Sequence, residues 1–358
     1  MVDRLGWGLR HATGLGPGRP KGCPRERTGF IIGVAQHLSV TVEIAVLRQR
    51  IQGLDADQYA ETIRERLPEA DVRVATTPKE EREALRTATI ATGLDLDPDV
   101  LSAAENLELF ACVFAGTEHL PLDALAEHGV AVTNASGVHA PNIAEHVLGG
   151  ILMFARDFPT AWRRKERREW RAFETRELQG STVTVLGLGA IGTAVLERLD
   201  PFGVHTIGLR HSPEKGGPAD EIAGLEGEAI YDALSRSDYV VIATPLTDRT
   251  EGMIDAEALQ TIPAHGVLVN IARGKIVETD ALVHELQRNA LRGAVLDVTD
   301  PEPLPADHVL WGMDNVFLTP HTAGFTPKYW ERRAAVLADN VRAAQETGTF
   351  EDLRNQIQ

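Results

Sequence analysis

The sequence contains little cysteine, few aromatic residues and no long hydrophobic run. Of its 358 residues 2 are cysteines, and aromatic residues make up 5%. Cys23 and Cys112 lie far apart in the chain and have no metal-ligand spacing, so they predict no disulfide framework and are typical of a reducing compartment. No apolar run approaches the roughly 18–20 residues that span a bilayer. We therefore expect a cytoplasmic protein with no membrane partner.

Basic residues are outnumbered by acidic ones. The 36 lysines and arginines stand against 52 aspartates and glutamates, which gives a formal net charge of -16. An acidic surface repels nucleic acid and anionic membranes, so neither is expected as a partner. Because carboxylates retain water and hydrated cations, we also expect a halophilic protein, adapted to concentrated salt.

Strand-like apolar runs alternate with helical patterns after residue 40, which indicates parallel sheets joined by helices. The first block has five predicted strands, at residues 42–47, 72–75, 90–92, 109–113 and 131–133. The second has six, at residues 182–186, 205–209, 239–243, 267–271, 294–297 and 316–318. Residues 141–170 and the segment from Thr326 onward are predicted to be helical. Residues 1–39, rich in glycine and proline, are expected to be a disordered or non-native extension.

A glycine-rich loop lies between a predicted strand and a predicted helix. Gly187-Leu188-Gly189-Ala190-Ile191-Gly192 follows the strand at residues 182–186. The first glycine allows a tight turn, the second lets a pyrophosphate approach the backbone, and the third lets helix and strand pack closely. The free N–H groups of the helix N-terminus bind phosphates. This context predicts a dinucleotide site rather than ordinary turn glycines.

The end of the next strand carries basic and polar residues instead of the acidic residue that binds the ribose of NAD. Arg210, His211 and Ser212 stand there. A cation with two polar donors suits the 2′-phosphate of NADP. We therefore expect NADP to be preferred, with NAD possible, although Arg210 could also be a solvated loop residue.

Three polar residues follow the last three predicted strands. Arg273, Glu302 and His321 come after the strands at residues 267–271, 294–297 and 316–318. Ligands of open parallel sheets bind beyond the carboxyl ends of the strands. All three are therefore expected at the same edge as the glycine loop.

These motifs together resemble the D-isomer-specific 2-hydroxyacid dehydrogenase family. The resemblance covers about residues 41–353 and is carried by the glycine loop, by Thr244-Pro245-Leu246-Thr247 and by three further segments, which are 270–274, 297–304 and 320–324. It implies an α/β fold of two Rossmann-like or flavodoxin-like domains with an active site in the cleft between them. Residues 40–140 plus 323–358 would bind substrate, and residues 141–322 would form the dinucleotide-binding Rossmann domain.

The resemblance implies reduction of a 2-keto acid to its D-2-hydroxy acid. His321 would be the general acid and base, Glu302 would orient its ring, and Arg273 would position the carboxylate and carbonyl of the substrate. Backbone amides of three residues would take the other end of the carboxylate, namely Ala115, Gly116 and Thr117.

Further cofactor contacts follow from the same resemblance. Asp297 would bind the nicotinamide carboxamide, with a turn cap as its structural alternative. The other residues expected to line the cofactor are Thr244, Pro245, Ile271, Ala272, Arg273 and His321. A homodimer is expected, and the apolar start of the 141–170 helix could contribute to its interface.

Two alternatives remain open. Related proteins include dinucleotide-sensing corepressors and phosphite dehydrogenases with a similar triad, whereas Glu302 argues against formate, since formate dehydrogenases carry glutamine there. Segments 116–119 and 139–142 depart from common family versions, which leaves the substrate side chain undefined.

His139, Glu145 and His146 lack further ligands at usable spacing, so no metal is expected. The basic run 163–171 is interleaved with glutamates and predicts a solvated helix rather than a nucleic-acid site.

Overall fold

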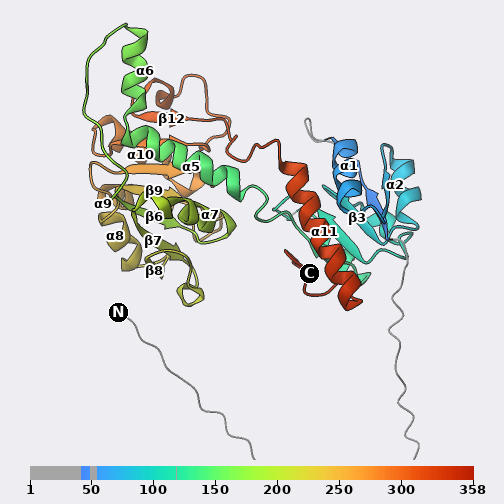
Figure 1. Cartoon of the computed structure of the whole chain (residues 1–358). Helices are drawn as coiled ribbons and strands as arrows, with labels where there is room; N and C mark the ends of the chain where they lie inside the picture. Colours follow the sequence, from blue (N-terminus) through green and yellow to red (C-terminus); the bar gives the residue numbers. More distant parts are fainter. Residues whose placement is uncertain (1–41, 49–54, 118) are drawn as a thin grey trace, which may run out of the picture. The chain divides into compact units, whose positions relative to one another are not determined.

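The computed structural model describes residues 42–48, 55–117 and 119–358. The predicted extension at residues 1–39, together with Cys23 and Glu118, lies outside these ranges. The described chain is an α/β protein with two parallel sheets (Figure 1), as the alternation of strand and helix signals predicted.

The first sheet has five parallel strands in the order β2-β1-β3-β4-β5. These strands are β1 (Glu43–Val46), β2 (Asp71–Val74), β3 (Ile90–Gly93), β4 (Leu109–Cys112) and β5 (Ala131–Thr133). Successive residues of a strand face opposite sides. Accordingly, Ile44 and Val46 of β1 belong to the hydrophobic core on one face, and Ala45 belongs to the core on the other.

Helices cover both faces of this sheet. On one side α1 (Ala56–Arg66) packs against the C-terminal helix α11 (Tyr329–Thr347), where the ring of Tyr59 stacks on that of Trp330 at 4.4 Å between centroids. The helices of the other side are α2 (Pro78–Leu85), α3 (Pro98–Leu101) and α4 (Leu122–Glu127). The periodic apolar residues after Thr326 therefore form a helix that packs with the first block of strands, as predicted.

The second sheet has seven parallel strands in the order β12-β11-β10-β9-β6-β7-β8, one more than predicted. Its strands are β6 (Thr182–Leu186), β7 (His205–Arg210), β8 (Glu221–Gly224), β9 (Tyr239–Ile242), β10 (Val267–Asn270), β11 (Gly293–Leu296) and β12 (Val316–Leu318). The missed strand is β8. It lies at an edge, all four of its residues are only partly buried, and Ile222 is its single branched apolar residue, so its sequence carries almost no strand signal.

Helices also cover both faces of the second sheet. One face packs on α5 (Ala140–Ala155) and α7 (Ala190–Leu199). Helices on the other are α8 (Glu228–Ser235), α9 (Ala256–Thr261) and α10 (Thr279–Gln287). The strand order reverses between β6 and β9, which makes their carboxyl ends the ligand-binding position of a doubly wound sheet.

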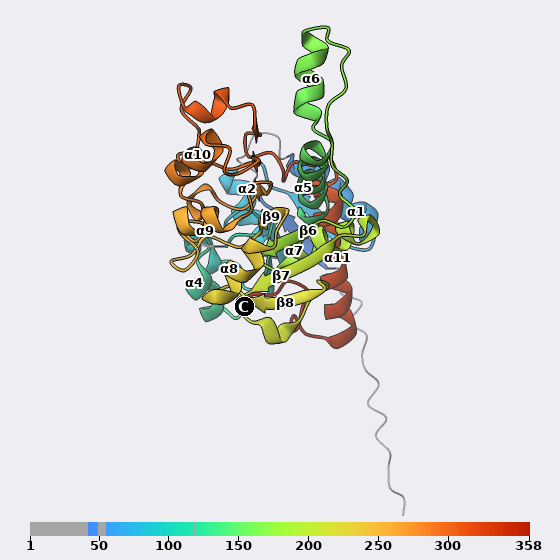
Figure 2. The same ribbon diagram turned by 90° about the vertical axis from the view of Figure 1, so that its left-hand side faces the viewer.

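The predicted helical segment at residues 141–170 is two helices rather than one. Asp157 has a left-handed backbone with φ 49° and separates α5 from α6 (Phe158–Glu166). The apolar start of the segment is buried in the chain's own core, where Ile151 and Phe154 pack with the sheet. A contribution of this segment to a subunit interface stays a prediction. By contrast, α6 extends away from the sheet (Figures 1 and 2).

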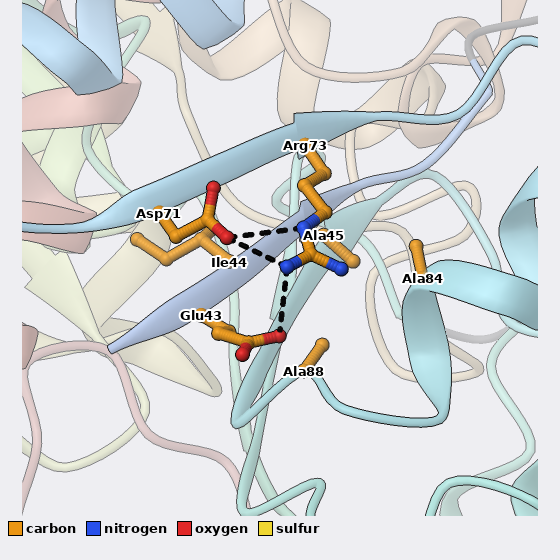
Figure 3. A pocket seen from close by; sticks show the side chains of 7 residues that line it. All are labelled: Glu43, Ile44, Ala45, Asp71, Arg73, Ala84 and Ala88. Atoms are coloured by element: carbon orange, nitrogen blue, oxygen red, sulfur yellow. Dashed lines mark hydrogen bonds and ion pairs between the residues drawn. The ribbon is translucent and has the colours of Figure 1, made fainter. Parts of the chain in front are cut away.

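A surface ion cluster links the outer strand β2 to β1, in addition to their backbone hydrogen bonds. Arg73 contacts Asp71 at 2.7 Å and Glu43 at 3.6 Å (Figure 3). All three side chains are partly exposed, so this group contributes little to stability. Within the described part of the chain, no helix is both long and apolar enough to cross a membrane.

Candidate functional site

The glycine-rich loop joins β6 to α7 at the point where the strand order reverses. Gly187 has φ +100°, and a Cβ there would lie 2.7 Å from the carbonyl oxygen of Ala243. A Cβ on Gly192 would lie 1.9 Å from the carbonyl oxygen of Gly187, so only glycine lets helix and strand pack this closely. A Cβ on Gly189 would have no atom within 4 Å. The loop therefore leaves open space beside the helix N-terminus, which fits a pyrophosphate.

A cavity of about 680 Å³ opens beside this loop. Its walls come from the glycine loop, the segment after β7, residues after β8 and the turn after β9. The predicted cofactor residues that line it are Gly187, Gly189, Arg210, His211, Ser212, Thr244 and Pro245. Other predicted cofactor residues lie outside this lining, namely Ala190, Ile191, Gly192, Ile271, Ala272, Arg273, Asp297 and His321.

Charged side chains surround one part of the cavity. Nη1 of Arg210 donates to the carbonyl oxygen of Gly216 at 2.5 Å, which fastens the turn after β7. Lys215, Glu226 and Arg249 also line the cavity, and the sequence analysis did not single them out. Each lies beyond the carboxyl end of a strand, and this position is the only signal that could have identified them.

The three predicted catalytic residues follow neighbouring parallel strands. Arg273 follows β10, Glu302 follows β11 and His321 follows β12, so all three leave the sheet at the edge that carries the glycine loop. The amide of Asn270 fixes the first of these loops, because its Nδ2 donates to the carbonyl oxygen of Arg273 at 3.0 Å. Nη1 of Arg273 donates to the carbonyl oxygen of Ala272 at 2.7 Å.

The structure pairs His321 with Glu302. Nδ1 of the imidazole lies 2.6 Å from Oε1 of the carboxylate, and the two side chains are 47% and 43% exposed. Since Nδ1 faces Glu302, Nε2 is left for another partner. Within the described residues Arg273 makes no hydrogen bond or ion pair with either. The structure therefore shows direct contact between His321 and Glu302, and it places Arg273 at the same sheet edge without contact to them.

Asp297 holds the segment that carries His321. Its side chain is 2% exposed and accepts three hydrogen bonds, from Thr319 Oγ1 at 2.6 Å, from Thr322 N at 2.9 Å and from Ala323 N at 2.9 Å. This is the turn-capping role that the sequence left as an alternative. His321 itself has a left-handed backbone, with φ 54°, within the capped turn. A contact of Asp297 with a carboxamide stays a prediction.

The loop after β4 contains the predicted carboxylate-binding amides. Asn134 Nδ2 donates to the carbonyl oxygen of Ala115 at 2.8 Å, and Leu120 N donates to that of Thr117 at 3.0 Å. In the described ranges, the N–H groups of Ala115, Gly116 and Thr117 donate to no protein acceptor. They are chemically suited to bind an anion.

Cys112 is a buried free cysteine. Burial raises its pKa, and the backbone N–H of Phe114 opposes that rise. Among the residues that the structure describes, no cluster of three or more histidine, cysteine or acidic side chains could hold a metal ion.

Comparison with known proteins adds a family to this geometry. Residues 148–323 match the family model described as D-isomer specific 2-hydroxyacid dehydrogenase, NAD binding domain. The chain is 34% identical over 265 residues to the (S)-sulfolactate dehydrogenase of Chromohalobacter salexigens, covering 73% of this chain and 84% of the relative. It is 31% identical over 286 residues to the D-3-phosphoglycerate dehydrogenase of Methanocaldococcus jannaschii, covering 78% of this chain but only 54% of that relative.

A solved structure shares the fold of the described chain. The D-isomer specific 2-hydroxyacid dehydrogenase from Xanthobacter autotrophicus, crystallised in complex with NADPH and MES, aligns with a TM-score of 0.70 at 27% sequence identity. The alignment covers 88% of this chain and 98% of that one.

Proposed function

The chain belongs to the D-isomer specific 2-hydroxyacid dehydrogenase family, whose members are NAD(P)-dependent oxidoreductases, and on that premise we propose that it interconverts a small 2-keto acid and the D-2-hydroxy acid. The observation that carries this proposal is the 2.6 Å contact of His321 with Glu302 at the same sheet edge as the glycine loop. A nicotinamide dinucleotide supplies the hydride that C2 of the keto acid accepts.

His321 is proposed to move the proton. With Nδ1 turned to Glu302, the protonated ring presents Nε2–H to the carbonyl oxygen and donates its proton as that oxygen becomes a hydroxyl. In the oxidative direction the neutral ring takes the proton back at Nε2. Glu302 acts on this step through the ring: it fixes the orientation of the imidazole and stabilises its positive charge.

Arg273 and the loop after β4 are proposed to orient the substrate. The planar guanidinium of Arg273 offers paired donors to the carboxylate and the carbonyl of the substrate. Its Nη1 also donates to the carbonyl oxygen of Ala272, which helps to fix its orientation. The N–H groups of residues 115–117, which donate to no acceptor among the described residues, bind the opposite side of the carboxylate. Because both sides of the carboxylate are held, C2 presents one face to the hydride, which predicts a single stereoisomer of the product.

We also propose that NADP is preferred over NAD. The cavity beside the glycine loop is lined at one end by Arg210, His211 and Ser212, and its lining includes no acidic residue directly after β7. Support comes from the 27% identical Xanthobacter protein, which was crystallised with NADPH. A higher kcat/KM for NADH than for NADPH would contradict this preference.

A homodimer is proposed from the exposed aromatic residues of one segment. Phe158 and Trp162 on α6 are 55% and 61% exposed, and Trp170 after it is fully exposed. Large aromatic side chains in water mark contact surfaces. Light scattering of the wild-type protein should give the mass of a dimer, and Trp162→Glu should lower it. A monomeric wild-type protein would contradict the proposal.

The net charge of -16 supports a proposal of salt adaptation. Concentrated salt screens repulsion among the carboxylates, since the Debye length falls to about 3 Å in molar salt. Activity and melting temperature should both rise with KCl concentration. Full activity and stability in dilute buffer would contradict this.

The proposed reaction is tested with purified protein, NADPH or NADH and a panel of 2-keto acids, followed by nicotinamide absorbance. The panel includes members with a sulfonate, a phosphate or an apolar side chain, and phosphite with NADP⁺ and NAD⁺ as a separate arm. Turnover of at least one keto acid to the D product supports the proposal. Turnover of phosphite alone, or cofactor binding without turnover of any member, would overturn it.

A further inference from the structure

The turn after β9 brings a second guanidinium to the cavity from a different part of the chain. We propose that Arg249 is a specificity-determining residue that binds the 2′-phosphate of NADP(H), and that Glu226 is its counter-ion in competition with that phosphate. The inference rests on the proposed dinucleotide site and deepens it, because it assigns the recognition of the phosphate to residues outside the segment after β7.

The backbone under Arg249 is fixed. Oγ1 of Thr250, a residue only 5% exposed, donates to the carbonyl oxygen of Pro245 at 2.6 Å and accepts from the N–H of Thr247 at 2.8 Å. The N–H of Glu251 donates to the carbonyl oxygen of Thr247 at 2.9 Å. These bonds close the turn around Arg249, so its side chain leaves from a defined position at the cavity wall.

The side chain of Arg249 reaches across the glycine loop. Nη1 lies 3.3 Å from each ring nitrogen of His211, which follows β7, although Arg249 itself follows β9. In the sheet order β9-β6-β7, the strand between these two is β6, the strand that carries the glycine loop. The contact therefore spans the end of the cavity where the segment after β7 meets the turn after β9.

A carboxylate already occupies the anion position between these groups. Oε1 of Glu226 lies 3.4 Å from Nη1 of Arg249 and 3.8 Å from Nδ1 of His211. All three side chains are about two-thirds exposed, so the group can be rearranged without opening the core. A phosphate monoester carries close to two negative charges at neutral pH and is a stronger partner for a guanidinium than one carboxylate.

The charges of the cavity wall fit this ligand. Three basic residues line the cavity, which are Arg210, Lys215 and Arg249, against two acidic ones, which are Asp248 and Glu226. One nitrogen of Arg210 is committed to the carbonyl oxygen of Gly216. Arg249 has no comparable bond to the backbone in the described structure, and its contacts are with His211 and Glu226. Of the two arginines, Arg249 is therefore the one whose partners are more readily exchanged.

Glu226 has the opposite preference. Its carboxylate repels a 2′-phosphate but accepts a hydrogen bond from the 2′-hydroxyl that NAD carries at the same place. Arg249 and Glu226 thus oppose each other in the choice between NADP and NAD, and substitution of either should shift that choice in opposite directions.

The test measures binding of 2′-AMP and 5′-AMP by calorimetry, which needs neither hydride transfer nor a substrate. Arg249→Gln should weaken 2′-AMP binding roughly 10- to 100-fold, the range expected for one charge-assisted hydrogen bond, with at most about a twofold change for 5′-AMP. Glu226→Gln should strengthen 2′-AMP binding several-fold. Lys79→Gln on α2 removes the same charge from a side chain that is 82% exposed and should change neither constant. Thermal unfolding of each variant confirms that it is folded.

The outcomes separate the two levels of the proposal. A wild-type protein that prefers 2′-AMP while Arg249→Gln leaves the ratio unchanged overturns the role of Arg249 alone. Equal loss of both nucleotides in Arg249→Gln also overturns it, because that result indicates a general rather than a phosphate-specific effect. A wild-type protein that binds NADP⁺ no more tightly than NAD⁺ in the same measurement overturns the proposed NADP preference as well.

Discussion

The seven-stranded sheet has a carboxyl edge, where its parallel strands end, and an amino edge, where they begin. A histidine paired with a glutamate occurs at each of these two edges. At the carboxyl edge Nδ1 of His321 lies 2.6 Å from Oε1 of Glu302, and at the amino edge Nε2 of His205 lies 2.6 Å from Oε1 of Glu221. The two histidines are 47% and 44% exposed. In distance and exposure the pairs are nearly the same.

Their surroundings differ. The carboxyl-edge pair shares its edge with the glycine loop and with Arg273, and Asp297 caps the turn that holds it. In the amino-edge pair, the carboxylate of Glu221 also forms an ion pair with the guanidinium of Arg236 at 2.9 Å. The histidine–glutamate contact is therefore a candidate acid–base pair only at the carboxyl edge, where the glycine loop and Arg273 also lie. At the amino edge the same contact is a surface ion cluster.

The largest expected effect separates the two histidines by activity. His321→Ala should lower kcat at least roughly 100-fold, because it removes the group that transfers the proton. His205→Ala removes an equally exposed and equally paired histidine and should leave kcat within about twofold, since a surface pair contributes little. Steady-state kinetics with the best keto acid measures both. Equal effects of the two substitutions would abolish the distinction between the edges.

A second expected effect concerns the close backbone approach at the carboxyl edge. Gly192→Ala places a Cβ 1.9 Å from the carbonyl oxygen of Gly187 and should destabilise the fold by about 2 kcal/mol, with weaker dinucleotide binding. Gly149→Ala on α5 meets no atom within 4 Å and should be neutral or stabilising, because alanine favours a helix interior. Denaturant unfolding compares them. Equal stabilities would show that the loop does not require its third glycine.

The third prediction compares a buried arginine that has no hydrogen-bond partner with a neighbouring arginine that has two. Arg333 on α11 is fully buried, and in the described part of the chain none of its guanidinium nitrogens has a hydrogen-bond partner. Because a buried charge without a partner is costly, Arg333→Met should raise the free energy of unfolding by about 1–2 kcal/mol. Its neighbour Arg332 contacts Val138 O at 3.0 Å and Asn142 Oδ1 at 2.9 Å, so Arg332→Met should lower it. The prediction fails if both substitutions act in the same direction.

The smallest expected effect is the acid response of the amino-edge cluster. The hydrogen bond from Arg236, and then that from His205, lowers the pKa of Glu221 to about 2. Since this folded-state pKa is depressed, the stabilisation is present above about pH 4.5 and is lost as the pH falls towards 2. Arg236→Gln should therefore reduce the loss of melting temperature between pH 5 and pH 2, a range set by that shift. Identical pH profiles for the variant and the wild type would contradict the assignment.

Strong local patterns made much of the second sheet predictable. The glycine loop, the strand before it and the helix after it were recognisable because the motif has a fixed spacing, and Gly187 and Gly192 each lie too close to the backbone for a Cβ. Edge strand β8 was not, because half-buried residues such as Glu221 and Gly224 carry no alternation. The break between α5 and α6 at Asp157 was also missed, since a left-handed residue other than glycine has no reliable sequence signal.

The candidate site was predictable only in part. Residues directly after strong strands were found, since their place follows from the strand signal itself. Glu226 and Arg249 were not, because they come from a weak strand and from a turn held by the buried hydroxyl of Thr250. Asp297 could be named from sequence, but its capping of the His321 turn depends on the close approach of β11 and β12.

The sequence by itself determined the family, the glycine loop and the identity of the residues at the strand ends, because these depend on local patterns and fixed spacings. Only the tertiary structure decided that His205 meets Glu221 at the opposite edge, and that Arg249 reaches His211 across β6. The physical reason is that strand order and chain direction, which a linear pattern does not encode, decide which side chains share an edge.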